Sequence, residues 1–556
     1  MRKAFIIILC CIAVLLTGYA GYRSYTVWKC SHLMSLAHQF LAKADGQNAL
    51  LCAQQVLRSE PHNLDATRVM AQLTEAARSP TALLWWTRVV ELNPHSLDDR
   101  LALAQTALIM RDYSSANDAL EAMDQAGKNT AAYHNIAGAV AAAANQSAQA
   151  EAHFLEAARL DPQNQTVQLN LAVMRLHGSN DLDQAEARIM LQRLSSNATN
   201  SFLRCQALRE LAVDALRHRQ ADQALSWSQH LLQETNSVFQ DWLLRLEVLQ
   251  QTGNAGFRPA LTSVQHEAGG DSGKIYELAT WQMAKTSPQD ALAWLRTLPS
   301  NTQSNQSVEL VAAECGTLLQ DWRGLQGSLT NQNWAELECV RHAYLSRALR
   351  GQELADSAKA EWEQALKAAN GQKENLVILL RLAAQWNWQS EGEDILWIIV
   401  KRYPGEQWAI RALVQVMYLG GRTRPLMQLY SQEARRDPSD LLTKNNLAMI
   451  ALLLDAQELK PYDLAREVYQ KSPTNAVYAS TYAFSLYLQG KNAEALKVMG
   501  TLNQRELEDP SIAGYYGLIL KASGDRAGAR AYLDWTSRAR LLPEEKALFE
   551  QAKAGL

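Results

Sequence analysis

A glycine-rich stretch is the first place where the sequence could do chemistry. The residues AGGDSGKI, at positions 268–275, resemble a phosphate-binding loop. Such a loop needs a glycine six residues before its lysine, and a Ser or Thr after the lysine to hold magnesium. Ala268 and Ile275 occupy those two positions. We therefore interpret the stretch as a loop between helices rather than as a nucleotide site.

Candidate metal ligands and catalytic groups are sparse. Glu338 and His342 are one helical turn apart, but two ligands are too few for a catalytic zinc site. The seven cysteines contain no CxxC pair and lie at positions 10, 11, 30, 52, 205, 315 and 339. We predict no metal, no cofactor and no enzymatic activity. An enzyme would need an acid, base or nucleophile assembled from distant parts of the chain, and the sequence identifies none.

A recurring Asn-Ile/Leu-Ala tripeptide is a better candidate for binding. It begins at Asn135, Asn170 and Asn446, each two residues before an alanine. An amide offers both donors and an acceptor, so it can pair with a peptide unit in either direction. Arg175 and Lys444 lie close to these asparagines in the sequence. The alternative is that the asparagines are exposed polar residues or link adjacent helices.

Tryptophan is concentrated in the middle of the chain. Nine of the fifteen tryptophans fall between residues 281 and 408, and Trp386 and Trp388 flank a predicted helix–helix turn. An exposed pair of such rings would provide an aromatic surface for stacking on a sugar or a peptide. The alternative is that large rings fill the wider gaps of irregular repeats.

A fixed period organises the elements that must position these residues. Small residues and prolines recur about every 34 residues, as alanine does at 49, 82, 116 and 150, and proline at 404, 438 and 473. Such a period is typical of solenoids. Each unit shows two amphipathic helical segments, and proline ends the second. No strand-like alternation persists, so the sequence predicts an all-α chain.

Within one unit, Gly138, Ala150, Phe154 and Pro162 stand in the order that is typical of tetratricopeptide repeats. The sequence resembles that family, strongly over residues 35–165 and 400–545 and weakly between them. The resemblance implies an α-solenoid, a superhelix of stacked helical hairpins in which the three asparagines face a concave, peptide-binding groove. It also implies that the helices cross closely at Gly138, and that Phe154 fills the space toward the next unit. The arrangement is also similar to membrane-anchored repeat proteins of bacterial envelopes, some of which are associated with polysaccharide export.

The N-terminus predicts a membrane anchor. Residues 4–22 carry no charge, and 19 residues of helix measure about 28 Å, close to the thickness of the hydrocarbon core. A signal peptide cleaved near residues 18–20 is the alternative. Both interpretations place the bulk of the chain outside the cytoplasm, in the periplasm if the source is bacterial. We expect a single-pass membrane protein with one N-terminal transmembrane helix.

The bulk properties complete the prediction. A chain of 556 residues exceeds the usual size of one core, and a net charge of −3 argues against a nucleic-acid partner. We predict an anchor at 1–28, regular repeats at 30–165, degenerate repeats at 166–400 and regular repeats at 401–556, ending in a capping helix that starts at Pro543. The predicted function is a non-catalytic, membrane-tethered scaffold that binds an extended peptide or a partner protein on its concave face. An accessory role in polysaccharide export, or glycan binding through the Trp-rich middle, is the alternative.

Overall fold

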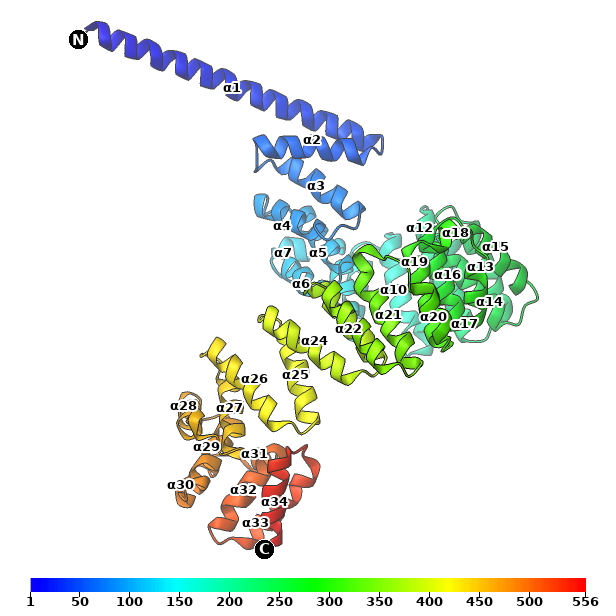
Figure 1. Ribbon diagram of the computed structural model, residues 1–556. Helices are drawn as coiled ribbons and strands as arrows, with labels where there is room; N and C mark the ends of the chain where they lie inside the picture. Colours follow the sequence, from blue (N-terminus) through cyan, green and yellow to red (C-terminus); the bar gives the residue numbers. More distant parts are fainter. Residues whose placement is uncertain (1) are drawn as a thin grey trace. The chain divides into compact units, whose positions relative to one another are not determined.

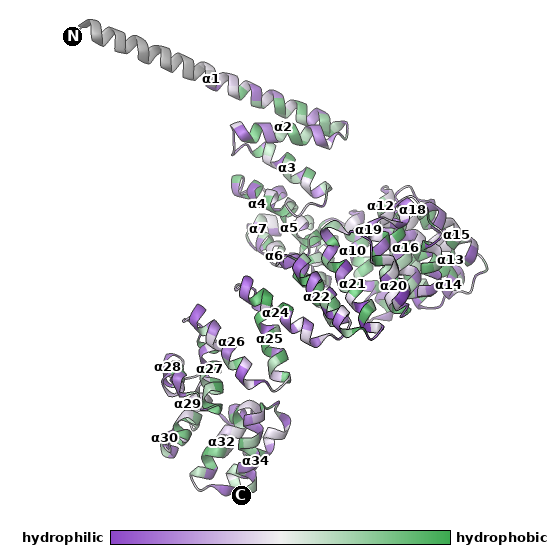
Figure 2. Cartoon of the chain, in the orientation of Figure 1, coloured by the Kyte–Doolittle hydropathy of each residue, from purple (hydrophilic) through white to green (hydrophobic). Residues whose placement is uncertain are grey.

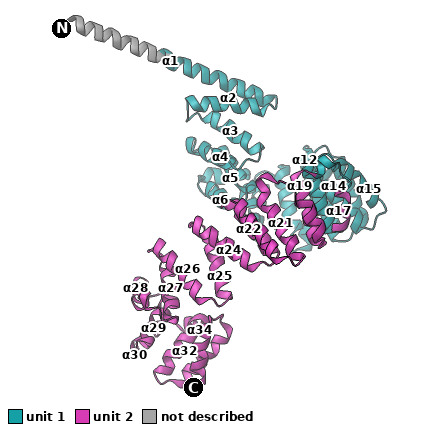
Figure 3. Cartoon of the chain, in the orientation of Figure 1, with its two compact units in different colours: residues 1–287, 297–303 teal, residues 288–296, 304–556 magenta. Residues whose placement is uncertain are grey.

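The protein is a chain of helical hairpins (Figure 1). The computed structural model describes the backbone of residues 2–556, and the side chains of residue 21 and residues 23–556. No strand occurs among residues 2–556, which confirms the predicted all-α class. The chain consists of two compact units, shown in different colours in Figure 3.

The first unit comprises residues 1–287 and 297–303. Its helices are α1 (Arg2–Ala42), α2 (Gly46–Ser59), α3 (Leu64–Ala76), α4 (Ala82–Leu92), α5 (Leu97–Ile109), α6 (Tyr113–Glu121), α7 (Gln125–Lys128), α8 (Ala131–Ala143), α9 (Ser147–Leu160), α10 (Gln165–Leu176), α11 (Asp181–Asn197), α12 (Ser201–Arg217), α13 (Ala221–Gln233), α14 (Phe239–Gln251), α15 (Phe257–Ala268), α16 (Ser272–Lys285) and α18 (Ser300–Gln303).

The second unit comprises residues 288–296 and 304–556. Its helices are α17 (Pro288–Leu295), α19 (Gln306–Leu318), α20 (Trp322–Leu329), α21 (Glu338–Gly351), α22 (Ala355–Ala368), α23 (Lys373–Gln385), α24 (Gln389–Arg402), α25 (Gln407–Leu419), α26 (Thr423–Arg436), α27 (Leu441–Leu453), α28 (Pro461–Lys471), α29 (Ala476–Leu488), α30 (Asn492–Met499), α31 (Gln504–Leu507), α32 (Pro510–Ala522), α33 (Arg526–Trp535) and α34 (Pro543–Ala554), with short 3-10 helices at Ala335–Leu337, Gln457–Leu459 and Thr536–Arg538.

Each hairpin buries the apolar stripe of one helix against its neighbour in the chain. Helix α8 packs on α9, α21 on α22 and α32 on α33. Figure 2 shows hydrophobic and hydrophilic residues interspersed along the described helices, as expected when one side of each helix is buried. Aspartate and asparagine start many of the helices by accepting backbone N–H groups, as Asp112 does for α6 and Asn164 for α10.

The turn inside each hairpin repeats with the period that the sequence predicts. In most of these turns one residue adopts a left-handed backbone, at positions 44, 78, 111 and 145 and then at 219 and 253 in the first unit, and at 320, 353, 387, 421, 455, 490 and 524 in the second. Successive positions within each of these three series are 33 to 35 residues apart. Regular turn spacing therefore occurs at positions 219 and 253 and again from Gln320, inside the segment 166–400 that the sequence predicts to be degenerate. The alanine spacing alone does not indicate this regularity.

The mid-helix glycines lie where helices approach closely. A Cβ atom on Gly138 would lie 2.8 Å from the ring of Phe154, and one on Gly517 would lie 2.8 Å from Cγ of Leu533. Phe154 therefore packs back on its own hairpin. The ring also belongs to a cluster that includes Leu171 of the following helix, α10. The predicted reason for a glycine at position 138 is confirmed.

No helix among the described residues is long and apolar enough to cross a membrane. The uncharged stretch of the predicted anchor, residues 4–22, lies outside the residues whose side chains the structure describes, apart from Gly21. The five described cysteines are free thiols, four of them buried: Cys30, Cys52, Cys205, Cys315 and Cys339.

Candidate functional site

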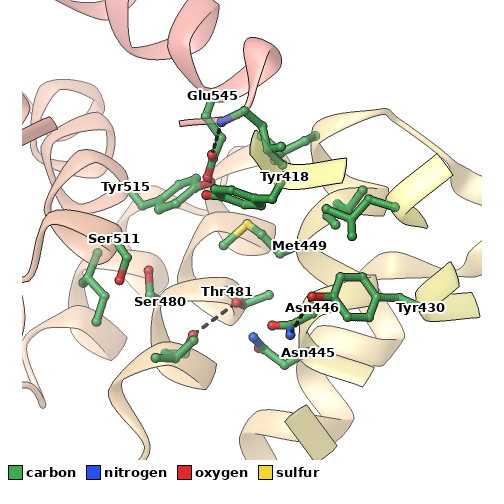
Figure 4. Close-up of a pocket in the computed structure, with 16 residues that line it drawn as sticks. Tyr418, Tyr430, Asn445, Asn446, Met449, Ser480, Thr481, Ser511, Tyr515 and Glu545 are labelled. Carbon is green, nitrogen blue, oxygen red and sulfur yellow. Dashed lines mark hydrogen bonds between the residues drawn. The ribbon is translucent and has the colours of Figure 1, made fainter. Parts of the chain in front are cut away.

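A cavity of about 260 Å³ lies inside the C-terminal repeats of the second unit (Figure 4). Its walls come from α25, α26, α27, α29 and α32 and from the start of α34. Sixteen residues line it: Tyr418, Leu426, Tyr430, Asn445, Asn446, Met449, Ile450, Leu453, Val477, Ser480, Thr481, Ser511, Ile512, Tyr515, Leu542 and Glu545. The cavity is therefore mixed in character, with an apolar and aromatic wall and a few polar groups.

Helical periodicity explains why these particular residues meet. Residues three and four positions apart share one face of a helix. In α27 this face carries positions 445, 446, 449, 450 and 453, and in α29 it carries 477, 480 and 481. Three consecutive hairpins turn the same face of their first helices toward one space.

The C-terminal segment closes this space. The backbone is extended at Leu542 (φ −67°, ψ 156°), directly before α34. The Tyr418 hydroxyl donates a hydrogen bond to the carbonyl oxygen of Arg540 at 3.0 Å, and Thr423 donates to the carboxylate of Glu544. The Leu542 side chain is buried. The repeats thus hold an extended segment of their own chain through one main-chain carbonyl and one apolar side chain.

The predicted capping helix is confirmed as α34, with Pro543 in its first turn. Glu545 of this helix does not face solvent, however, because it lies against the cavity and is 8% exposed. Its carboxylate accepts hydrogen bonds from the Tyr515 hydroxyl and, at 2.8 Å, from the backbone N–H of Leu542. A carboxylate in the first turn of a helix interacts favourably with the helix dipole. The structure adds a buried hydrogen-bonding role.

Burial favours the neutral forms of the ionisable groups of the cavity. It raises the pKa of the Glu545 carboxyl, although the bonds from Tyr515 and Leu542 act in the opposite direction. It also raises the pKa of Tyr418 to about 12, and the pKa of Tyr515 well above its ordinary value. No lysine, arginine or histidine lines the cavity within the described chain. The walls therefore carry no cation.

Two buried polar atoms of the cavity wall have no hydrogen-bond partner. They are Oδ1 of Asn445 and Oγ of Ser480, and both residues are 2% exposed. A buried polar atom left without a partner costs about 1–3 kcal/mol. Asn445 Oδ1 could therefore accept a hydrogen bond from a donor, and Ser480 Oγ could donate or accept one.

The predicted asparagines occupy two separate places. Asn170 Nδ2 donates to Asn135 Oδ1 at 2.9 Å, so these two link adjacent helices α8 and α10 in the first unit. Asn446 lines the cavity in the second unit, and its Nδ2 lies 3.4 Å from the Tyr430 hydroxyl. The structure therefore brings one of the three predicted asparagines to the cavity.

The predicted cationic residues are held in ion pairs. Arg175 contacts Glu186 at 3.1 Å and Glu151 at 3.6 Å. Lys444 contacts Glu467 at 2.9 Å. Neither cation lines the cavity.

The prediction of an aromatic surface at Trp386 and Trp388 is wrong. The two residues are 8% and 5% exposed and belong to the main core of the second unit. Their ring centroids are 5.0 Å apart, and the guanidinium of Arg350 lies 3.8 Å from the Trp388 ring. Wide gaps between these helices are filled by large rings, which is the alternative that the sequence left open.

The other sequence candidates have structural roles. Asp271 caps α16 by accepting the N–H groups of Gly273 and Lys274, so the glycine-rich stretch is a loop between helices, as predicted. Glu338 is bonded to Arg341, and His342 to Glu361. In the described part of the chain, no three His, Cys, Asp or Glu side chains form a group that could hold a metal.

Sequence reasoning missed most residues of the cavity. Tyr418, Ser480, Tyr515 and Glu545 come from helices spread over more than 120 positions, and no local pattern joins them. The neighbouring Asn445 was the accessible signal, because it stands next to a predicted binding asparagine on a first helix.

Comparison with known proteins gives matches among solved structures alone. No family model matches the sequence, and no curated protein matches it significantly. One matching structure, MamA 41-end from Desulfovibrio magneticus RS-1, is 17% identical with a TM-score of 0.29, and the match covers 31% of this chain and 98% of that one. PilF of Pseudomonas aeruginosa is 15% identical with a TM-score of 0.32, covering 40% and 97%. The Cut9–Hcn1 structure of the APC/C is 12% identical with a TM-score of 0.30, covering 82% and 96%.

These matching structures are helical-repeat proteins of the tetratricopeptide type. TM-scores near 0.3 carry no conclusion about function.

Proposed function

We propose that the protein is a scaffold that binds a segment of a partner protein in the cavity of its C-terminal repeats. The observation that supports this most directly is the extended segment before α34. Tyr418 already recognises that segment through the main-chain carbonyl of Arg540, and the wall accepts the side chain of Leu542. A surface that binds an extended chain in this way is suited to a second extended chain from a partner.

Membrane tethering is a second part of the proposal. Its support is the uncharged stretch at residues 4–22, which is long enough to span a bilayer. The bulk of the chain would then lie outside the cytoplasm. Retention of the full chain in membranes after alkaline extraction, and release of a variant lacking residues 4–22, would support the tether. Digestion of the repeats by protease added to intact cells would support the external location.

The main argument for the alternative function, glycan binding, no longer holds. It depended on Trp386 and Trp388 forming a surface, and both rings are buried. A protein segment is therefore the partner that we propose.

A photo-crosslinking amino acid at the cavity tests the binding site. Val477 lines the cavity and is 43% exposed, so benzoylphenylalanine at this position should form a covalent adduct with the partner in intact cells. Leu488 is a matched control, because it lies on the same helix, is 40% exposed and is not part of the cavity wall. A protein adduct at position 477 but not at 488 is the expected result. Equal labelling at both positions would contradict the proposed site.

A further inference from the structure

The cavity of the C-terminal repeats has polar and charge properties that restrict what it can bind. We infer that it binds an uncharged, internal segment of the partner's chain, and that one peptide group or primary amide of this segment forms hydrogen bonds with Asn445 and Ser480. This inference rests on the proposed function and names the chemistry of the ligand.

The unpartnered atoms define the hydrogen bonds that a ligand must supply. Oδ1 of Asn445 is an acceptor and needs an N–H donor, whereas Oγ of Ser480 can donate to a carbonyl. A peptide group, or a primary amide, carries one N–H donor and one carbonyl acceptor together. Figure 4 shows both residues below Met449, Ser480 beside Ser511 and Asn445 beside Asn446. One amide unit therefore supplies both kinds of hydrogen bond that the protein leaves unmade.

The absence of cations argues against a ligand with a free carboxylate. Within the described chain no lysine, arginine or histidine lines the cavity. A carboxylate entering it would lose its water without gaining a charged partner, which is strongly unfavourable. A C-terminal carboxylate or an acidic side chain is therefore not expected to bind in the cavity.

A cationic ligand is also disfavoured, because the one carboxyl group is already used. Both oxygens of Glu545 accept hydrogen bonds, from Tyr515 and from the backbone of Leu542. Burial raises the pKa of this carboxyl group and so favours its neutral form. A carboxyl group in its neutral form offers an ammonium group no charged partner.

The rest of the wall fits apolar or aromatic side chains. Met449, Ile450, Leu453, Val477 and Ile512 are apolar members of the wall, and the chain's own Leu542 belongs to the same hydrophobic cluster as Ile450 and Leu453. The ligand is therefore expected to carry aliphatic or aromatic side chains on either side of the bound amide. This combination describes an internal, neutral stretch of polypeptide.

Defined peptide panels test the inference on the full-length chain in detergent micelles. The probes are terminally blocked hexapeptides rich in Leu, Phe, Asn and Gln, matched panels that add one Asp or one Lys, and a neutral maltohexaose. We expect the neutral panel to contain the tightest ligands. We also expect Ser480→Ala and Asn445→Leu each to weaken their binding at least tenfold.

The variants separate a binding role from a structural one. Each removes a polar atom that has no partner in the free protein, so the melting temperature should stay unchanged or rise. A purely structural residue would lower it. Thr106→Val is the matched control, because Thr106 Oγ1 is also buried without a partner but belongs to the first unit and does not line the cavity. This control should bind the neutral peptides normally. Ser480→Ala removes a single oxygen, so it remains informative if Asn445→Leu does not fold.

The possible contrary results have distinct meanings. If the charged panels bind more tightly and Ser480→Ala weakens them, the inferred ligand class is wrong while the proposed function stands. If neutral peptides bind equally well to both variants, the assignment of Asn445 and Ser480 is overturned. If only maltohexaose binds, or if no panel binds, both the inference and the proposed peptide site are overturned.

Discussion

Replacing Gly517 by alanine tests whether close helix contact, rather than helix propensity, determines the residue at this position. A Cβ atom here would lie 2.8 Å from Cγ of Leu533, 3.1 Å from the carbonyl oxygen of Ala529 and 3.2 Å from the backbone nitrogen of Leu533. Leu533 is fully buried, and the backbone of α33 cannot move without shifting the whole helix. The new methyl group therefore has no space to occupy.

Two opposing terms set the magnitude. Alanine in a helix interior gains about 1 kcal/mol over glycine. Overpacking a filled site costs about 1–3 kcal/mol, and contact with backbone atoms places this site near the upper end. We expect Gly517→Ala to destabilise the C-terminal hairpins by about 1–2 kcal/mol. The matched control is Gly327→Ala in α20, where a Cβ meets nothing within 4 Å and should stabilise locally.

Hydrogen exchange is the suitable assay, because a long repeat array does not unfold in one step. Each 1.4 kcal/mol corresponds to a tenfold change in the opening equilibrium. Amides of α32 and α33 should therefore exchange roughly five- to thirtyfold faster in Gly517→Ala, and those of α20 more slowly in Gly327→Ala. In a Leu533→Ala background, which removes the nearest contact, the effect of Gly517→Ala should shrink. Unchanged or slower exchange in α32 and α33 of the single variant would refute the reasoning.

Two further predictions concern charged and titratable groups of the first unit. Arg209 contacts Asp241 through two hydrogen bonds of 2.5 and 2.9 Å, and Asp241 is 1% exposed. Asp241→Ala should therefore destabilise α12–α14 by about 3–5 kcal/mol, because it leaves a partly buried guanidinium without its partner. Denaturant unfolding followed by hydrogen exchange in these helices measures this loss of stability. A loss below about 1 kcal/mol would contradict the prediction. His134 and His153 lie 2.9 Å apart through their Nδ1 atoms, and burial lowers the pKa of both. The folded state thus binds fewer protons than the unfolded state, so the stability of α8–α9 should be fully present above pH 6.5 and fall as the pH drops below that value. A His153→Gln variant should show a flatter profile between pH 7 and 5, and an equally steep profile would be contrary evidence.

The fold could be predicted from the sequence because the helical hairpin repeats along the chain. The spacing of Ala150, Phe154 and Pro162 is typical of tetratricopeptide repeats. This spacing reflects contacts within one hairpin, where the contacting residues lie within about 35 positions of one another. The same locality explains why the loop between helices at the glycine-rich stretch and the start of α34 at Pro543 agree with the expectations.

The errors arise where a side chain's surroundings come from distant residues. Trp386 and Trp388 stand at a turn, which favours exposure, but the neighbouring helices leave gaps that these rings fill. Asn135 and Asn170 bond to each other across adjacent helices, which is the alternative role that the sequence left open. A period of helices predicts which residues share a face, but it does not predict whether that face meets solvent, a neighbour or a cavity.

The sequence by itself determined the helical hairpin, its turn and its period, because these depend on contacts between residues close in the chain. Tertiary structure alone decided the cavity. It forms because α34 returns to α25 and α26, about 120 residues away, and places Glu545 and Leu542 beside first helices that carry Asn445 and Ser480. That closure depends on the summed curvature of several hairpins, a quantity that no local pattern contains.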